Sequence, residues 1–308
     1  MVTQAISTQL LDPLNRLYRE RLAQSVAQLL KATVLTPNVV TILHTFIGVV
    51  GAYLIYREEY IFAVLCLELR AILDCVDGIL ARLKNQSTAM GRALDTIGDG
   101  IAFNALMIAG AVRLLNDFKN YPRPLIVIGV LSFAFVAVHS GVVYHLMRRK
   151  LVSIAHKEVD AVEVEWREHY EQTKGTHPPV LARFGFWVDS MTIKFVSEEW
   201  YLKVLKRRDL SNWKEKAIQE AETMHELACK TRRKEFHRAV YATSFVSDDN
   251  VFSLMSFCFI IFGLFHSFIF PFVHPVLIAF SVGFLYSLVT LCLGLRFYHS
   301  FLHGVYRE

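Results

Sequence analysis

The chain has 308 residues, of which 54% are hydrophobic and 20% are charged, and its formal net charge is +5. This is more apolar than an average soluble domain. The positive charge is modest and includes no basic run that could follow a nucleic acid backbone, so we expect no nucleic acid partner. The five cysteines show no paired spacing, which indicates neither a disulfide framework nor a zinc site.

The first 33 residues precede the apolar regions and form a segment of their own. Leucines and valines recur there at helical spacing among several arginines. This pattern predicts an amphipathic helix that lies along the membrane surface. A helix that packs on a soluble partner is the alternative.

Apolar residues then gather in two regions, residues 34–151 and 251–308, in stretches long enough to cross a bilayer core of about 30 Å. We predict an all-α, multi-pass integral membrane protein with six spans, four in the first region and two in the second. The predicted spans are residues 37–56, 60–83, 89–115, 124–147, 251–270 and 275–297.

Between these regions, residues 152–250 are strongly charged and read as a helical insertion, with helices expected near 151–173 and 212–241. Six spans place both termini and this insertion on the same side of the membrane. Lysine and arginine are concentrated on that side, in "MRRK" (147–150) and "TRRK" (231–234). The positive-inside bias therefore predicts that the termini and the insertion are cytoplasmic.

Four aspartates lie inside the second and third predicted spans. Asp74 and Asp77 are three residues apart, and Asp95 and Asp99 are four apart, so each pair shares one helix face. The short turn at residues 84–88 makes the two helices antiparallel neighbours. We therefore expect all four carboxylates to converge at the cytoplasmic end of the helices.

Four ionised carboxylates at one point repel one another, and burial opposes their ionisation as well. Two divalent cations would neutralise them, and an all-oxygen ligand set favours Mg²⁺ or Mn²⁺. Gly78, Ala81 and Gly91 keep the neighbourhood small, which allows close helix contact or approach of a ligand. Arg82 could pair with a carboxylate or hold a substrate phosphate.

Two other interpretations of the aspartates stay open. They could form inert salt bridges with Arg70, Arg82 and Arg92, although charge inside a membrane usually marks function. They could also form the transport site of a divalent-cation transporter. Arg70 lies four residues before Asp74, and we expect it to orient a site carboxylate through an ion pair.

The spacing of these residues resembles the signature of the CDP-alcohol phosphotransferase family at every fixed position. The matching residues are Asp74-x2-Asp77-Gly78-x2-Ala81-Arg82-x8-Gly91-x3-Asp95-x3-Asp99. "TPNVVT" (36–41) at the start of the first span is similar to relatives as well. The insertion at 152–250 departs from the family pattern, so the resemblance implies nothing about it.

The resemblance implies an enzyme that joins a lipid and an alcohol through phosphate, uses a CDP-linked donor and releases CMP. It also implies a homodimer in the bilayer and two Mg²⁺ or Mn²⁺ ions. By the same resemblance, Asp74, Asp77, Asp95 and Asp99 form the metal site, and Asp99, close to the metals, is also the general base. Residues expected to hold the CDP group are Gly78, Ala81, Arg82 and Gly91, with Asn38 and Thr41 reaching the nucleotide from the first span.

The family contains two donor classes. Some members transfer a phosphatidyl group from CDP-diacylglycerol to a polar alcohol, and others transfer phosphocholine or phosphoethanolamine from CDP-choline or CDP-ethanolamine to a lipid hydroxyl, that of diacylglycerol or ceramide. Residues 83–90, "LKNQSTAM", lack the additional arginine and proline of the second class, which favours CDP-diacylglycerol. Arg148 and Arg149 could bind a phosphate on the acceptor, or simply anchor the fourth span at the cytoplasmic face.

Overall fold

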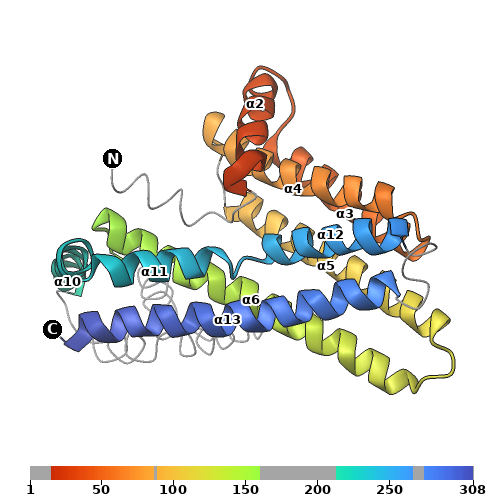
Figure 1. Ribbon diagram of the computed structural model, residues 1–308. Helices are drawn as coiled ribbons and strands as arrows, with labels where there is room; N and C mark the ends of the chain where they lie inside the picture. Colours follow the sequence, from red (N-terminus) through yellow and green to blue (C-terminus); the bar gives the residue numbers. More distant parts are fainter. Residues whose placement is uncertain (1–14, 87–88, 160–212, 266–273, 308) are drawn as a thin grey trace, which may run out of the picture. The chain divides into compact units, whose positions relative to one another are not determined.

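The computed structural model describes residues 15–86, 89–159, 213–265 and 274–307 (Figure 1). These residues are helical with short connections and contain no strand, which confirms the predicted all-α class. In chain order the elements are η1 (Asn15–Arg19), α2 (Glu20–Lys31), α3 (Pro37–Tyr56), α4 (Tyr60–Leu83), α5 (Ala89–Asp117), α6 (Arg123–His156), α10 (Trp213–Glu226), η2 (Leu227–Thr231), α11 (Arg233–Ser244), α12 (Asp248–Phe265) and α13 (Pro275–Arg307). Both η elements are single π-helical turns.

Within the described part of the chain, four helices are long and apolar enough to cross a membrane. They are Pro37–Tyr56, Ile97–Asp117, Arg123–His156 and Pro275–Val305. A fifth is obtained if Arg233–Ser244 and Asp249–Gly263, which follow each other along the chain, form one broken span. Helix α4 has 24 residues, enough to cross, but it carries several charged side chains. The six membrane-spanning segments named from the sequence therefore stay a prediction.

Two helices run further than the sequence pattern predicts. Helix α6 continues to His156, past the expected end near 147, and α13 continues to Arg307, past the expected end near 297. The added turns are held by packing, because Leu151 of α6 and Phe301 of α13 are fully buried in one apolar cluster. Tertiary burial therefore extends helices beyond their most apolar segments.

The chain divides into two compact units. Unit 1 comprises residues 1–12, 139–247 and 288–308. Its core is an apolar cluster formed by the ends of α6 and α13 with α10 and α11, and it buries Phe236 and Tyr298 almost completely. Helices α10 and α11 cover the predicted helical stretch at 212–241, whereas most of the predicted helix at 151–173 lies outside the described residues.

Unit 2 comprises residues 13–138 and 248–287 and contains the four motif aspartates. Helix α3 packs along both α4 and α5, and α12 packs on α4. Glycines permit close contact, since a Cβ on Gly51 would lie 3.2 Å from the side chain of Leu67 on α4. Helices α3, α4 and α5 thereby form the frame that positions the candidate site.

The N-terminal segment of unit 2 packs against α4. Helix α2 buries Ala23 and Ala27 in a cluster with Val76 and Leu80 of α4. The preceding π-helical turn places Arg19, 2% exposed, on α4, where its Nε and Nη2 each donate a 2.6 Å hydrogen bond to the Glu68 carboxylate. This segment is helical as predicted, and its location on the membrane surface stays a prediction.

Breaking the ion pair between Arg19 and Glu68 is expected to destabilise the fold. We expect Arg19→Met to lower the free energy of unfolding by roughly 2–4 kcal/mol, since Glu68 then loses both hydrogen bonds in a partly buried place. Adding Glu68→Leu to this variant should restore much of the loss. Thermal unfolding in detergent measures both changes. The exposed Lys230 pairs with Glu226, so Lys230→Met is the control that should leave the melting temperature unchanged; a melting temperature for Arg19→Met equal to wild type would contradict the prediction.

Candidate metal centre

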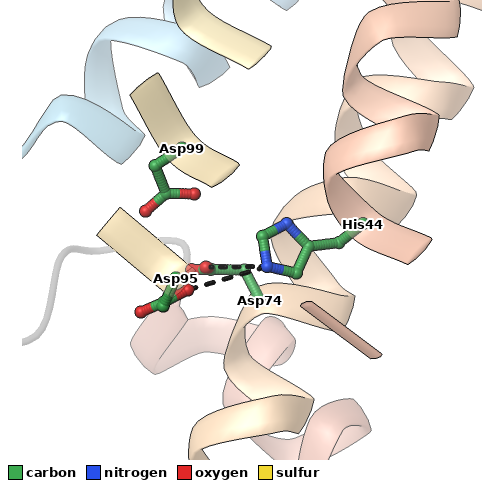
Figure 2. A group of neighbouring side chains, drawn as sticks. All are labelled: His44, Asp74, Asp95 and Asp99. Carbon is green, nitrogen blue, oxygen red and sulfur yellow. Dashed lines mark ion pairs between the residues drawn. The ribbon is translucent and has the colours of Figure 1, made fainter. Parts of the chain in front are cut away.

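Three of the four motif aspartates come together with a histidine in unit 2, on the facing sides of α4 and α5, whereas Asp77 contacts the same histidine from outside this group. Figure 2 shows Asp74 from α4 with Asp95 and Asp99 from α5 around the imidazole of His44 from α3. One potential ligand atom from each of these four residues lies within 4.8 Å of every other. Three helices therefore deliver three carboxylates and one imidazole to a single point.

His44 lies at the centre of this group and was not singled out by the sequence pattern. Its side chain is completely buried, and its Nε2 lies 3.3 Å from Asp77 Oδ2, 3.6 Å from Asp95 Oδ1 and 3.8 Å from Asp74 Oδ1. In the sequence it is one polar residue in an apolar span. The available signal was its spacing, because it follows Thr41 by three residues and so shares that residue's helix face.

Asp77 is the most buried of the motif aspartates and has a neighbour on α3. The Thr41 hydroxyl lies 2.6 Å from Asp77 Oδ2 and donates to it. The structure thus places Thr41 on a site carboxylate, while Asn38, one turn earlier, is exposed. The contact of Thr41 and Asn38 with a nucleotide stays a prediction.

Arg70 holds Asp99. Its Nη2 donates to Asp99 Oδ1 at 2.5 Å, and its guanidinium lies over the ring of Phe252 on α12, 5.4 Å from the ring centre. The sequence predicted an orienting ion pair for Arg70 because of its spacing from Asp74, and the partner in the structure is on the next helix. Gly48 makes this possible, since a Cβ there would lie 2.9 Å from Arg70 Cδ.

The residues expected to hold CDP surround the same end of α4 and α5. Arg82 is exposed, and Ala81 and Gly91 are half-buried. Among the residues that the structure describes, a Cβ on Gly78 would meet only the Arg82 guanidinium, at 3.7 Å. This leaves space beside the aspartates for a ligand. Their binding of CDP stays a prediction.

Arg148 and Arg149 lie on the part of α6 that belongs to unit 1. Both are half-buried, and the Arg148 guanidinium lies 6.0 Å from the ring centre of Tyr144. Nothing in this arrangement assigns them a ligand, and their proposed contact with an acceptor phosphate stays a prediction.

The site fits a divalent cation. His44 Nε2 and Asp95 Oδ1 are buried without a hydrogen-bond partner, although buried polar atoms are normally paired. In the described residues, the ion pairs of the motif aspartates are with His44 and Arg70. Carboxylate oxygens that converge within ligand distance of one another, with buried atoms left unpaired, are what a bound metal ion would satisfy.

The family model described as CDP-alcohol phosphatidyltransferase matches residues 34–161. Residues 34–161, less than half of the chain, are therefore similar to this family. The resemblance drawn from the motif is confirmed over this range, which contains α3 to α6 and all four motif aspartates. The description of this family is that of a transferase.

Two curated proteins of Aquifex aeolicus (strain VF5) are similar to parts of this chain. An uncharacterized protein is 33% identical over 93 residues, which cover 29% of this chain and 47% of the relative. A CDP-diacylglycerol–glycerol-3-phosphate 3-phosphatidyltransferase is 31% identical over 65 residues, 21% of this chain and 36% of the relative. The chain thus spans less than half the length of these relatives. No solved structure matches the chain.

Proposed function

We propose that this protein transfers a phosphatidyl group from CDP-diacylglycerol to a polar alcohol and releases CMP. The observation that carries the proposal is the convergence of Asp74, Asp95 and Asp99 with His44, within 4.8 Å, in the part of the chain that matches the CDP-alcohol phosphatidyltransferase family model. The name of the second relative supports CDP-diacylglycerol as the donor. Residues 83–90 lack the additional arginine and proline of the members that use CDP-choline or CDP-ethanolamine, which favours the same donor.

In the proposed site, Asp74, Asp77 and Asp95 hold two Mg²⁺ or Mn²⁺ ions, with Asp99 close by. When bound, such ions neutralise charge on the donor pyrophosphate and on the departing CMP. The Thr41 hydroxyl orients the Asp77 carboxylate through its 2.6 Å hydrogen bond. Arg82, which is exposed near the end of α4, would bind a phosphate oxygen of the donor.

Asp99 serves as the general base in this proposal. The acceptor hydroxyl oxygen forms a bond to the phosphorus that carries the diacylglycerol group, and the bond from that phosphorus to CMP breaks. The hydroxyl proton passes to the Asp99 carboxylate, whose Oδ1 is held by Arg70. In this proposal the Asp99 carboxylate already has its orientation before the acceptor binds, because Arg70 holds it. A fixed orientation favours efficient proton transfer.

The proposed arrangement in the membrane follows the sequence pattern. We take α4 as the second of six spans, since its charged residues face the site rather than lipid in this proposal. The site, the insertion at 152–250 and both termini are then cytoplasmic. Assembly as a homodimer, and the contact of Arg148 and Arg149 with an acceptor phosphate, stay predictions.

A donor panel tests the proposed reaction. The full chain, purified in detergent, is incubated with CDP-diacylglycerol and glycerol 3-phosphate or other polar alcohols. Parallel samples contain CDP-choline or CDP-ethanolamine with diacylglycerol or ceramide. CMP release and the new lipid, identified by mass spectrometry, are measured with Mg²⁺, with Mn²⁺ and with EDTA. We expect CMP and a new phospholipid from CDP-diacylglycerol, and none with EDTA.

The other outcomes separate the alternatives. CMP from CDP-choline or CDP-ethanolamine alone would replace phosphatidyl transfer by phosphocholine or phosphoethanolamine transfer to a lipid hydroxyl. Absence of CMP with every donor would overturn the enzyme proposal. Uptake of Mn²⁺ into vesicles that contain the protein would then identify a divalent-cation transporter.

A further inference from the structure

We propose that His44 is a direct metal ligand through its Nε2, so that this site combines one imidazole nitrogen with carboxylate oxygens and binds Mn²⁺ in preference to Mg²⁺. The inference deepens the proposed function and rests on it, because it assigns a residue to the metal which that function requires. His44 lies on α3, outside the motif that carries the aspartates.

The distances around Nε2 are those between ligands of one metal ion. The three carboxylate oxygens lie 3.3, 3.6 and 3.8 Å away, beyond the usual range of about 2.7–3.2 Å for an N–H···O hydrogen bond. Bonds of about 2.1 Å to a common cation place neighbouring ligands about 3.0 Å apart at right angles and about 3.4 Å apart at tetrahedral angles. The 3.3 Å separation from Asp77 Oδ2 falls within this range, and the separations of 3.6 and 3.8 Å exceed it by a few tenths of an ångström, so small movements of two side chains would let a cation bind between the nitrogen and the oxygens.

The burial of His44 supports the same conclusion. Its side chain is completely buried, and neither Nδ1 nor Nε2 has a hydrogen-bond partner. An unpaired buried polar atom is costly, and the carboxylate oxygens that form ion pairs with Nε2 lie 3.3–3.8 Å away, so a metal partner bound between them would satisfy the imidazole better than these ion pairs do. The partner must lie on the side of the carboxylates, because Nε2 faces them (Figure 2).

The position of the imidazole is set by close packing of α3. A Cβ on Gly48, one turn after His44, would lie 2.7 Å from the Cβ of Ala102 on α5. Gly98 of α5 also lies close to α3, since a Cβ added to it would lie 2.3 Å from Thr45 Oγ1. Contacts this close hold α3 against α5 and therefore hold the His44 nitrogen at a fixed distance from Asp95.

A nitrogen ligand changes which cation the site prefers. Oxygen ligands suit Mg²⁺ and Mn²⁺ alike, whereas imidazole favours transition-metal ions. Removing His44 should therefore weaken Mn²⁺ binding more than Mg²⁺ binding. The same distances could arise if a protonated His44 acted as a counter-ion in place of a metal. This rival predicts the opposite sign, because removal of a competing positive charge would tighten metal binding.

The test uses Mn²⁺ itself as the probe and the full-length protein in detergent. Free Mn²⁺ is titrated by electron paramagnetic resonance, and pulsed measurements on the bound ion detect coupling to a ligand nitrogen. We expect nitrogen coupling in wild type, its loss in His44→Gln, and Mn²⁺ affinity at least about tenfold weaker in that variant. Asp74→Asn should weaken binding as well but retain the nitrogen coupling.

His274→Gln is the matched control. His274 pairs with Asp117 at 2.7 Å, at the far end of α5, 22 residues and roughly 33 Å along the helix from Asp95. This variant should bind Mn²⁺ as wild type does. Competition with Mg²⁺ completes the experiment, and the ratio of Mn²⁺ to Mg²⁺ affinity should fall in His44→Gln alone.

Two results would overturn the inference. Wild-type protein that binds Mn²⁺ without nitrogen coupling removes His44 from the ligands, and this measurement needs no variant to fold. Unchanged or tighter Mn²⁺ binding in His44→Gln identifies His44 as a counter-ion. Neither result depends on CMP release, so loss of this inference leaves the proposed reaction in place. Nitrogen coupling without CMP from any donor would overturn the reaction and keep the ligand.

Discussion

Asp99→Asn is expected to lower kcat by about 10²- to 10⁴-fold while the affinity for the CDP-linked donor changes little. Asparagine has the shape of aspartate and can still accept a hydrogen bond from Arg70 through its amide oxygen. It cannot take the proton of the acceptor hydroxyl at neutral pH. The expected defect therefore lies in turnover, which CMP release at saturating donor measures.

Arg70 offers an independent check on this role. It donates to Asp99 Oδ1 at 2.5 Å and makes the base keep one orientation. If Arg70 acts only by positioning Asp99, Arg70→Ala should lower kcat in the wild-type background and have no further effect in the Asp99→Asn background. Equal losses in both backgrounds would show that Arg70 acts on something else.

Measurements of Mn²⁺ affinity distinguish a general base from a metal ligand. Mn²⁺ titration of Asp99→Asn should give an affinity within a few-fold of wild type, whereas Asp74→Asn should lose most of its Mn²⁺ affinity. A variant of Asp99 that turns over at the wild-type rate would remove this residue from the base role. If Asp99→Asn lost its Mn²⁺ affinity together with turnover, the main role of Asp99 would be that of a metal ligand.

The aspartates of the site could be predicted because their information is local. Spacings of three and four residues place Asp74 with Asp77 and Asp95 with Asp99 on single helix faces, and a turn of a few residues makes the two helices neighbours. The bounds of α3 and α4 could be predicted as well. A proline begins the first helix, and the charged "REEY" segment (57–60) separates the two. Each of these features is decided within one or two turns of helix.

The contribution of α3 could not be predicted in the same way. His44 and Thr41 reach the aspartates only because α3 packs against both α4 and α5 at one rotation about its axis. That rotation depends on which side chains are absent, at Gly48 and Gly98, as much as on those present. The periodicity of apolar residues can show that one face of α3 is buried. It does not show which helices that face packs against.

The same limit explains the partner of Arg70. Sequence spacing offers Asp74, one turn away on the same helix, whereas the guanidinium crosses to Asp99 on α5. The crossing requires the space left by Gly48 and the flat surface of Phe252. Residues from α3, α4, α5 and α12 thus decide a single ion pair, and long-range packing of this kind is outside what one sequence specifies by spacing.

The close approach of α3 and α5 leads to a prediction with a large effect on activity. Gly98 lies between Asp95 and Asp99 on α5, and a Cβ there would lie 2.3 Å from Thr45 Oγ1. Thr45 cannot easily turn away, because it is β-branched and its hydroxyl donates to the Thr41 carbonyl at 2.9 Å. Gly98→Ala must therefore push the two helices apart beside the site.

We expect Gly98→Ala to lower kcat by about 10²-fold, since displacement of reacting groups by about 1 Å costs that much. The strain should also lower the free energy of unfolding by about 1–3 kcal/mol. Thermal unfolding and CMP release measure the two effects separately. A loss of activity without the loss of His44 coupling to bound Mn²⁺ would locate the displacement at Asp99 rather than at the metal.

Gly100→Ala supplies the control two residues away on the same helix. A Cβ on Gly100 would meet no atom of the described residues within 4 Å, so alanine should raise stability by about 0.5–1 kcal/mol through its higher helix propensity and leave turnover unchanged. Both substitutions add one methyl group to α5 and gain the same propensity. The difference between them therefore measures the contact of α5 with α3, and equal behaviour of the two variants would show that this contact does not set the positions of Asp95 and Asp99.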